Sequence, residues 1–540
     1  ENQKVGPSMK RTPSEDTVRP SLDQQRAAIN RTIRDIEPKV ESLKHKAINR
    51  IRQHLMNQFH SFKSAEDLKK HHKELLQYGY LYQFLFKHAP DVAEDLKANY
   101  KSVTARLYLN YFKSYVQATS KLRYEIANKN DLVGVDDSKS LGFFSGKRTI
   151  KYKASVFALG IRQKIVDELD KPTALLLNSS NEKYPYEVLF KAILFLLMEK
   201  VTDEMGFTQD FFLFDMDWDL FNDIFGKVIE IFQENLAGYT TTSFDPVGIC
   251  IIVVTLQKYK VLMSKRLVSV LDPFFESAMN DLVDRFFYVF ELNTTSIRNV
   301  QPKDILQSIE LQPHYITRRY AELVVSVLYL SAISSEMGDK TFVERMNLNL
   351  DRMREEMAKC LMKMCEAKFK DWRSQTIFYI NNYDLIVSVI KEREMKGADV
   401  AKWEKNLTIK INDFTVAEMK KPFGKLLEFA AVHGPSVADD NNNEDGKTTA
   451  KEEEVDALLK NIDANWKKEL EAINNNLLKE FSNFKCGSRL FQKIVDDVVA
   501  AYNVLVKVTK KYFPNLRKNL PQKDITYDMK KMCVSFDNEN

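Results

Sequence analysis

Glycine and proline are scarce in this chain of 540 residues, which has 16 glycines and 15 prolines. Glycine makes up about 3% of the sequence, against about 7% in average proteins. Tight turns and sheet-rich folds use both residues often, so their shortage argues against a fold of many short strands. Because 44% of the residues are hydrophobic, the chain can bury several cores. We therefore predict an all-α protein of long helices with few connections.

Cysteine is also rare, and the chain has only five: Cys250, Cys360, Cys365, Cys486 and Cys533. They are widely spaced and mostly lie within apolar helical patterns, which is typical of reduced thiols. Cys360 and Cys365 are five residues apart. On a helix this spacing gives neither a shared ligand face nor a CxxC loop, so we predict no metal site there.

No large excess of one charge is present, since 80 basic residues face 75 acidic ones for a net charge of +5. Such a balance argues against a nucleic-acid-binding protein. One local basic excess lies at Lys44–Lys73, which also holds five histidines. This stretch fits an acidic partner or a lipid surface, but the solvated face of an amphipathic helix is the interpretation we favour.

Long hydrophobic runs are missing as well. The longest, Val247–Leu256, has ten residues, about half of the ~20 that a membrane-spanning helix needs. Residues 1–20 hold three prolines and lack the apolar core of a signal peptide. We therefore expect no membrane-spanning segment.

Enzyme signatures are absent from the sequence. There is no phosphate-binding P-loop, dinucleotide fingerprint, G-x-S-x-G elbow, H-E-x-x-H motif or kinase signature. Asp215, Asp217 and Asp219 alternate along a Phe-rich stretch, and a helix directs side chains with this spacing to different faces. We predict no catalytic, cofactor-binding or metal-binding residues, no cofactor, and no enzyme activity.

Hydrophobic periodicity divides the chain into consecutive segments. They are a disordered tail (1–20), a helical region that includes the end of a coiled coil (21–125), a loop-rich connector with short strand or irregular pieces (126–185), one helical bundle (186–310), a second (311–434), a disordered linker (435–452) and a C-terminal helical hairpin (453–540). We expect the bundles to follow one another along an elongated rod.

Some helices are predicted in more detail. Val247–Met263 is apolar on nearly every face, so it should lie at the centre of its bundle. Apolar residues recur every three or four positions across Val455–Phe484, which predicts an amphipathic helix of about 30 residues. Gly487 is expected to close this helix before the return helix begins.

Helix ends are predicted from proline and capping residues. Pro313 suits the first turn of a helix, where its missing N–H costs nothing. Thr415 and Glu418 have the spacing of a capping box that would start a helix before Phe423. The sequence His433-Gly434-Pro435 should end that helix.

Four blocks combine aromatic, charged and amide residues in ways that ordinary helix packing does not require. They are Pro313–Glu322 (PHYITRRYAE), Phe378–Arg393 (FYINNYDLIVSVIKER), Glu125–Ser145 (EIANKNDLVGVDDSKSLGFFS) and Tyr184–Phe190 (YPYEVLF). Arginine and tyrosine are typical interface anchors. The candidates for partner contact are Arg318, Arg319, Tyr320, Asn381, Asn382 and Asp384. Adjacent buried amides more often satisfy loop carbonyls or cap a neighbouring helix, so we favour a structural role for these residues.

The four blocks, in their order along the chain, resemble the vacuolar-protein-sorting subunit fifty-two family of the Golgi-associated retrograde protein complex. The resemblance covers about residues 45 to 530, and it implies a CATCHR-type tethering subunit built of stacked helical bundles. It also implies capture of endosome-derived vesicles at the trans-Golgi network, and a related assembly in endocytic recycling. Assembly in the family is implied to depend on an N-terminal coiled coil, of which Leu22–Phe62 corresponds to the end.

The same resemblance implies the partners and the location. The partners are three other subunits of the complex, syntaxin-type SNAREs and small GTPases of the Rab and Arl classes, with peripheral membrane contact and no nucleic acid. The location is the cytosol, at the surface of trans-Golgi network and endosomal membranes. Three alternatives stay open: a subunit of the exocyst or of the conserved oligomeric Golgi complex, a lipid-binding helical scaffold, and an enzyme without a recognisable motif.

Overall fold

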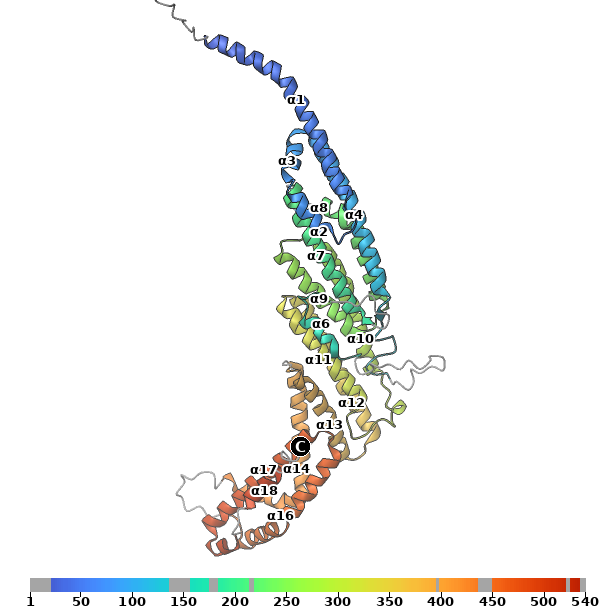
Figure 1. Cartoon of the computed structure of the whole chain (residues 1–540). Coiled ribbons are helices and arrows are strands. Elements are labelled where there is room, and N and C mark those ends of the chain that lie inside the picture. Colours follow the sequence, from blue (N-terminus) through green and yellow to red (C-terminus); the bar gives the residue numbers. More distant parts are fainter. Residues whose placement is uncertain are drawn as a thin grey trace, which may run out of the picture. The chain divides into compact units, whose positions relative to one another are not determined.

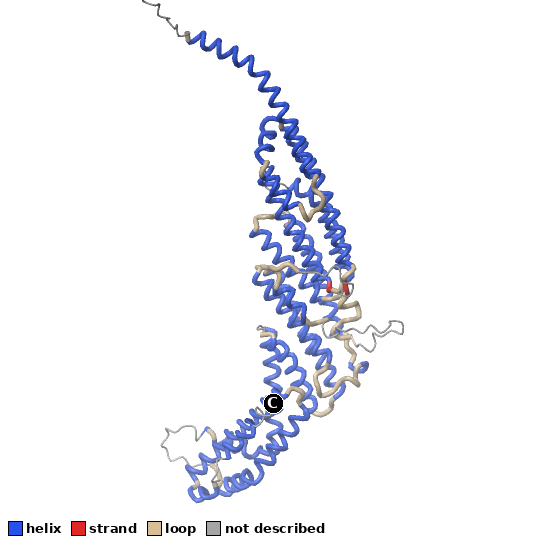
Figure 2. Tube along the Cα trace, viewed as in Figure 1, coloured by secondary structure: helices blue, strands red, loops and turns tan. Residues whose placement is uncertain are grey.

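The computed structural model describes residues 21–135, 156–173, 183–212, 218–394, 398–435, 449–520 and 525–534. Over these residues the fold is all-α, as predicted from the sequence, and the strands described there form a single two-stranded pair (Figure 2). The predicted tail at 1–20, most of the predicted linker at 435–452 and much of the predicted connector at 126–185 lie outside the described residues.

Long helices make up most of the described chain (Figure 1). In chain order the α-helices are α1 (Leu22–His60), α2 (Leu68–Leu76), α3 (Gly79–His88), α4 (Pro90–Ser120), α6 (Gln163–Asp167), α7 (Tyr186–Phe212), α8 (Trp218–Thr242), α9 (Pro246–Lys265), α10 (Asp272–Arg298), α11 (Tyr315–Glu336), α12 (Lys340–Lys368), α13 (Trp372–Glu392), α14 (Ala398–His433), α16 (Glu452–Glu480), α17 (Phe484–Tyr512) and α18 (Ile525–Val534). Short 3₁₀ helices are η2 (Gly160–Arg162), η3 (Pro302–Asp304) and η4 (Pro514–Asn519), and the strands are β1 (Arg123–Tyr124) and β2 (Tyr184–Pro185).

The chain forms two compact units that alternate along the sequence. Unit 1 comprises Glu1–Tyr115 and Glu199–Ile231, and unit 2 comprises Val116–Met198 and Phe232–Asn540. The segments expected from the sequence are each one continuous stretch of the chain, whereas each of these units combines two stretches. The predicted segment boundaries stay predictions.

The core of unit 1 is a cluster of aromatic rings. Tyr100 of α4 lies at its centre, with its ring 5.2 Å from Phe59, 5.5 Å from Phe207 and 5.2 Å from Phe212. Aromatic pairs at these separations and tilted angles add to the stabilisation that comes from burial alone. The residues therefore draw α1, α4 and α7 together within this unit.

The first half of α1 has no such covering. Its large aliphatic residues recur at intervals of three, four and seven, and all are about half exposed or more: Leu22 75%, Ile29 58%, Ile33 54%, Ile36 49%, Val40 52% and Leu43 65%. From Ile48 onward the apolar face of the same helix is buried. A continuous exposed stripe of this kind marks a surface on which another chain element can pack.

In unit 2, α9 is the central helix, as its all-apolar pattern predicted. Every residue from Pro246 to Gln257 is buried. The helix also has the length and mean hydropathy (1.5) of a membrane span. The count of consecutive apolar residues did not reveal this, because Gln257 ends the ten-residue run while the mean hydropathy over the helix stays high. Since 72% of that window is buried in the structure, α9 has the burial of a core helix.

Helix packing in unit 2 continues from α9 to α18. Helix α9 contacts α10 and α11, α11 contacts α12 and α13, and α13 contacts α14. Helix α14 then contacts α17, which also packs against α16 and α18. The packing of α9 on α11 and of α10 on α12 spans residue 310, where the sequence suggested an end of one bundle.

Two predicted helix starts were wrong. Pro313 does not lie in the first turn of α11, because His314 is the N-cap and its ring nitrogen accepts a hydrogen bond from the Ile316 N–H. Thr415 does not cap a helix, because it lies in the middle of α14, where its hydroxyl donates to the Asn412 carbonyl. The apolar face of α14 continues past Thr415, and its burial outweighs the local capping pattern. The predicted end at His433 is confirmed.

The C-terminal amphipathic helix is confirmed as α16, which has 29 residues. It ends at Glu480, before the position that the sequence suggested. Gly487 lies in the first turn of the return helix α17, where the side chain of Asn483 accepts from the Lys485 N–H as an N-cap. The turn is thus set by an asparagine cap rather than by the glycine.

The connector lies between two short strands, with β1 just before it and β2 at its end. β1 and β2 pair in parallel, with Arg123 opposite Tyr184. The described residues Val133, Val156 and Phe157 are buried, so these parts pack on the helices. The other aromatic residues of the connector at Phe143, Phe144 and Tyr152 lie outside the described residues.

Candidate functional site

The three candidates on α11 point in different directions. Arg318 is exposed (63% of its side chain). The Arg319 Nη1 donates to the Val135 carbonyl at 2.8 Å, and its guanidinium lies 4.8 Å from the ring centre of Tyr315. Tyr320 is buried, and its hydroxyl accepts a hydrogen bond from Trp403 at 3.2 Å. Of the three, Arg318 alone is exposed to solvent.

The candidates on α13 join three segments of unit 2. The Asn381 amide donates to the carbonyls of Leu311 and Glu480, at 2.9 Å each. The Asn382 amide oxygen accepts from the His314 N–H at 3.0 Å and from the Thr317 hydroxyl at 2.6 Å. These groups satisfy the backbone before α11 and at the end of α16, which is the structural use that the sequence favoured.

Asp384 extends this arrangement, which we call the α13 junction. Its carboxylate accepts from the Asn483 amide at 2.6 Å and from the Arg489 guanidinium at 3.3 Å. Asp384 is 5% exposed, while the Arg489 side chain is half exposed. The α13 junction therefore links α13 to the turn between α16 and α17. Whether any of the six candidates contacts a partner stays a prediction.

The third sequence block is fixed to α10 through a glycine. The Asn293 amide oxygen accepts from the Val133 N–H at 3.1 Å, and the Ser296 hydroxyl accepts from the Gly134 N–H at 2.9 Å. A side chain at Gly134 would overlap the Ser296 carbonyl, so only glycine allows this approach. Together with the Arg319 bond to Val135, these contacts assign residues 133–135 a packing role.

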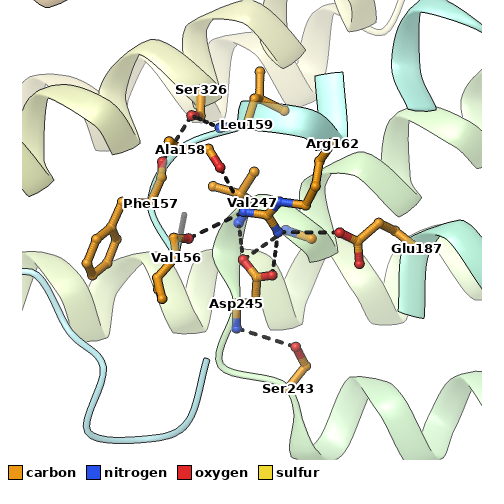
Figure 3. Close-up of polar contacts among 11 residues, drawn as sticks. Val156, Phe157, Ala158, Leu159, Arg162, Glu187, Ser243, Asp245, Val247 and Ser326 are labelled. Atoms are coloured by element: carbon orange, nitrogen blue, oxygen red, sulfur yellow. Dashed lines mark hydrogen bonds and ion pairs between the residues drawn. The ribbon is translucent and has the colours of Figure 1, made fainter. Parts of the chain in front are cut away.

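The fourth block contributes to a buried ion cluster that the sequence did not reveal. Arg162 of η2 is 3% exposed, and its Nη1 lies 2.6 Å from the Asp245 carboxylate and 3.4 Å from that of Glu187 (Figure 3). Its Nη2 donates to the Ala158 carbonyl at 3.0 Å. Arg162 therefore holds its own loop against the starts of α7 and α9. We call this group the Arg162 anchor.

The Arg162 anchor brings one cation against two carboxylates. Burial acts to lower the pKa of Arg162, but Asp245 and Glu187 outweigh it, so the pKa lies above its ordinary value. Burial raises the pKa of Glu187, and Arg162 only partly offsets this effect. Asp245 also accepts from the N–H groups of Val247 and Gly248 as the N-cap of α9. One carboxylate thus serves both the cation and the helix.

Unit 1 contains a different buried polar network. The hydroxyls of Tyr100 and Tyr108 donate to the two oxygens of Glu204 at 2.6 and 2.9 Å. Because Tyr100 has a single proton to give, the His72 Nε2 at 2.9 Å acts as donor to the Tyr100 oxygen. Burial raises the pKa of Glu204 to about 7 and lowers that of His72 to about 3. This network holds a carboxyl group that titrates near neutral pH.

Neither network has the layout of a catalytic centre. Among the described residues no group of three or more His, Cys, Asp or Glu side chains is placed to hold a metal ion. The five cysteines form no disulfide. Burial raises the pKa of the Cys360 and Cys486 thiols to about 12, so both stay protonated at neutral pH.

Comparison with known proteins gives a consistent result. The family model "Vps52, C-terminal" matches residues 102–415. Vacuolar protein sorting-associated protein 52 A of Arabidopsis thaliana is 28% identical over 94% of this chain and 71% of its own length, and protein 52 B of the same plant is 30% identical over 89% and 67%. The homologue of Homo sapiens is 25% identical over 92% and 68%. Among solved structures, a circular tandem repeat protein covers 91% of the chain at 10% identity with a TM-score of 0.23, too low to bear on the fold.

The all-helical fold and these matches define the class, which is that of vacuolar-sorting tether subunits and not of enzymes. The chain belongs to the Vps52 family.

Proposed function

We propose that this chain acts in retrograde transport from endosomes to the trans-Golgi network, as one of four subunits of a Golgi-associated retrograde protein complex. Its partners in this proposal are three sister subunits, a syntaxin-type SNARE and a small GTPase of the Rab or Arl class. It would work from the cytosolic surface of trans-Golgi network and endosomal membranes, and in a related assembly for endocytic recycling. The names of the relatives, with the four sequence blocks, support the vacuolar-sorting part.

The exposed stripe of α1 is the observation that carries the assembly part of the proposal. Ile29, Ile33, Ile36, Val40 and Leu43 follow one another at intervals of 4, 3, 4 and 3 residues, which is the heptad pattern of a coiled coil. Covering one large aliphatic side chain is worth about 1.5–3 kcal/mol. A helix from a sister subunit would bury several at once. Multiple contacts of this kind let a tether hold its partners without chemistry.

The test is copurification of the tagged chain with candidate sister subunits. We expect the wild-type chain to recover three other helical tether subunits of the retrograde complex. The variant I33E/V40E, which places charges in the seam, should lose at least one of them. The control R31E/R34E places two glutamates on the opposite face of α1, with a larger change in net charge, and should retain all three.

Other results would overturn the proposal. Recovery of exocyst or conserved oligomeric Golgi subunits would move the chain to another tether, and recovery of no sister subunit would refute the assignment to a complex. Equal recovery with I33E/V40E and with the wild type would show that the stripe on α1 is not the contact surface.

A further inference from the structure

The first two sequence blocks meet at a cleft that the α13 junction does not explain. About two turns from that junction, residues 158–163, α11 and α13 enclose a cavity of about 170 Å³. Its lining includes Arg318 and Glu322 from the first block and Val389 and Arg393 from the second. We call it the Arg318–Arg393 cleft, and all of it lies in unit 2.

The floor of the Arg318–Arg393 cleft is apolar and its rim is polar. Leu159 and Val325 are buried at 5% and 6% exposure, and Val389 is half-buried. Arg318 and Arg393 are both exposed. An apolar floor beside a few charged groups is the usual composition of a site that receives a side chain of another molecule.

The walls of the cleft are fixed before anything binds. The Ser326 hydroxyl accepts from the Leu159 N–H, and its single proton has two carbonyl acceptors in reach, Phe157 at 3.0 Å and Glu322 at 2.8 Å (Figure 3). The Arg162 anchor fixes the same loop to the starts of α7 and α9. A preformed pocket needs little ordering when a ligand binds, so more of the contact energy appears as affinity.

The charges around the cleft favour an acidic occupant. Arg318, Arg319 and Arg393 all act on the half-buried carboxylate of Glu322, whose pKa burial raises. The pairing is loose, since Arg318 lies 3.9 Å from Glu322. The Arg393 Nη1 donates to the neutral oxygen of Gln163 at 2.9 Å. Among the exposed residues of the lining, the two guanidinium groups of Arg318 and Arg393 accompany one carboxylate, that of Glu392, which leaves one positive charge in excess at the rim.

A second apolar contact lies next to the cleft. Ile161 is 80% exposed, although its neighbour Arg162 is buried. Because the loop is anchored on both sides, the Ile161 side chain is held in solvent at a defined position. Arginine is frequent among the few residues that dominate binding energy at interfaces, and Ile161 adds an exposed apolar contact beside the arginines of the cleft.

We infer that the Arg318–Arg393 cleft docks a segment of a partner protein that carries a carboxylate next to a large apolar side chain. The apolar side chain enters the cavity above Leu159 and Val325. The carboxylate pairs with Arg318 and Arg393, which bind carboxylates in a two-pronged geometry. This contact is separate from the α1 stripe, so a variant that loses one should keep the other.

The test uses a displayed library of short random peptides, selected on the full chain and counter-selected on the variant R318E/R393E. We expect enriched peptides to place Glu or Asp next to Leu, Ile or Phe. In fluorescence polarisation, R318E/R393E should weaken the best peptide by about tenfold or more. The control K405E/K420E, with the same charge change at exposed lysines of α14, should bind as the wild type does.

Two further measurements keep the test decisive. R318Q/R393Q removes the charges without reversing them, and it should also weaken binding if R318E/R393E fails to fold. Replacing the enriched Leu, Ile or Phe by Ser should abolish binding. Enrichment of basic peptides or of none would overturn the inference. So would vesicles of phosphatidylserine that bind the wild type and not R318E/R393E while no peptide does, because the surface would then be a membrane contact.

Discussion

Two glutamates on α7 show two ways of burying a carboxylate. Glu187, in unit 2, lies beside the Arg162 guanidinium, whereas Glu204, in unit 1, is surrounded by the neutral donors Tyr100 and Tyr108. Both side chains are at most 2% exposed. The Arg162 cation offsets part of the rise in the pKa of Glu187 that burial causes. Neutral hydroxyls leave the second close to its titration point. The first should therefore respond mainly to mutation, and the second to pH.

The largest expected effect comes from removing the cation. R162M leaves Glu187 and Asp245 buried without their guanidinium, so the free energy of unfolding should fall by about 3–5 kcal/mol. Urea unfolding followed by circular dichroism measures this change. The triple variant R162M/E187Q/D245N removes all three charges and keeps an Asn cap on α9, so it should recover a large part of the loss. A single variant as stable as the wild type would show that the carboxylates need no cation.

The next effect concerns pH and unit 1. In the folded protein the pKa of Glu204 is about 7, above its ordinary 4.5. The proton is therefore held more tightly in the folded state, and the resulting stability is present below pH 4.5 and lost as pH rises to 7. A tenfold difference in proton affinity is worth about 1.4 kcal/mol, so the loss is about 3 kcal/mol.

His72 has the opposite effect. Its pKa falls from 6.5 to about 3 in the folded protein, so its contribution to stability is present above pH 6.5 and lost as pH falls to 3. Between pH 4.5 and 6.5 the two slopes oppose each other. The wild type should therefore show little net pH dependence from this pair, although both groups titrate.

Single variants should separate the contributions of Glu204 and His72 to the change of unfolding free energy with pH. E204Q should become more stable as pH rises from 4.5 to 6.5, because only His72 then contributes, and H72Q should become less stable over the same range. Each slope should differ from that of the wild type by about 1.4 kcal/mol per pH unit. Urea unfolding at a series of pH values measures them. The stability of E204Q/H72Q should change with pH as that of the wild type does. Single variants that also follow the wild type would show that Glu204 and His72 do not have these shifted pKa values.

The smallest effect per buried group concerns an uncharged side chain at the α13 junction. N382A removes the acceptor of the His314 N–H and of the Thr317 hydroxyl. Each of these two buried donors, left without a partner, should cost about 1–3 kcal/mol, measured by urea unfolding. The control N465A changes an exposed asparagine that contacts the side chain of Asn461, and should stay within about 0.5 kcal/mol of the wild type. Equal losses in the two variants would show that burial does not set the cost.

The sequence predicted those features that depend on a long repeated pattern. The amphipathic helix α16 and the buried helix α9 follow from the spacing or continuity of many apolar residues, and the structural role of Asn381 and Asn382 follows from two amides within an apolar helix. Local patterns were less reliable. The Thr415–Glu418 spacing resembles a capping box, yet packing of the surrounding apolar face makes it helix interior.

The Arg162 anchor could not be predicted in the same way. Arg162 is one arginine in a loop, and its closest carboxylate, Asp245, lies 83 residues further along the chain. No periodicity links positions so far apart. The block Tyr184–Phe190 did draw attention to Glu187, but nothing in a single sequence indicates which cation faces it. The role of Gly134 was also hidden, because the Ser296 backbone that it contacts is distant in sequence.

Asp245 both pairs with Arg162 and caps α9, and these two roles bear on how the protein folds during synthesis. During synthesis at the ribosome, Arg162 and Glu187 emerge before Asp245, and domains begin to form as the chain appears. Until Asp245 is out, the guanidinium lacks its nearest counter-ion. Asp245 comes directly before α9, so the cap is already present when the residues of that helix emerge. The residue that completes the Arg162 anchor is therefore also the first one that the central helix needs.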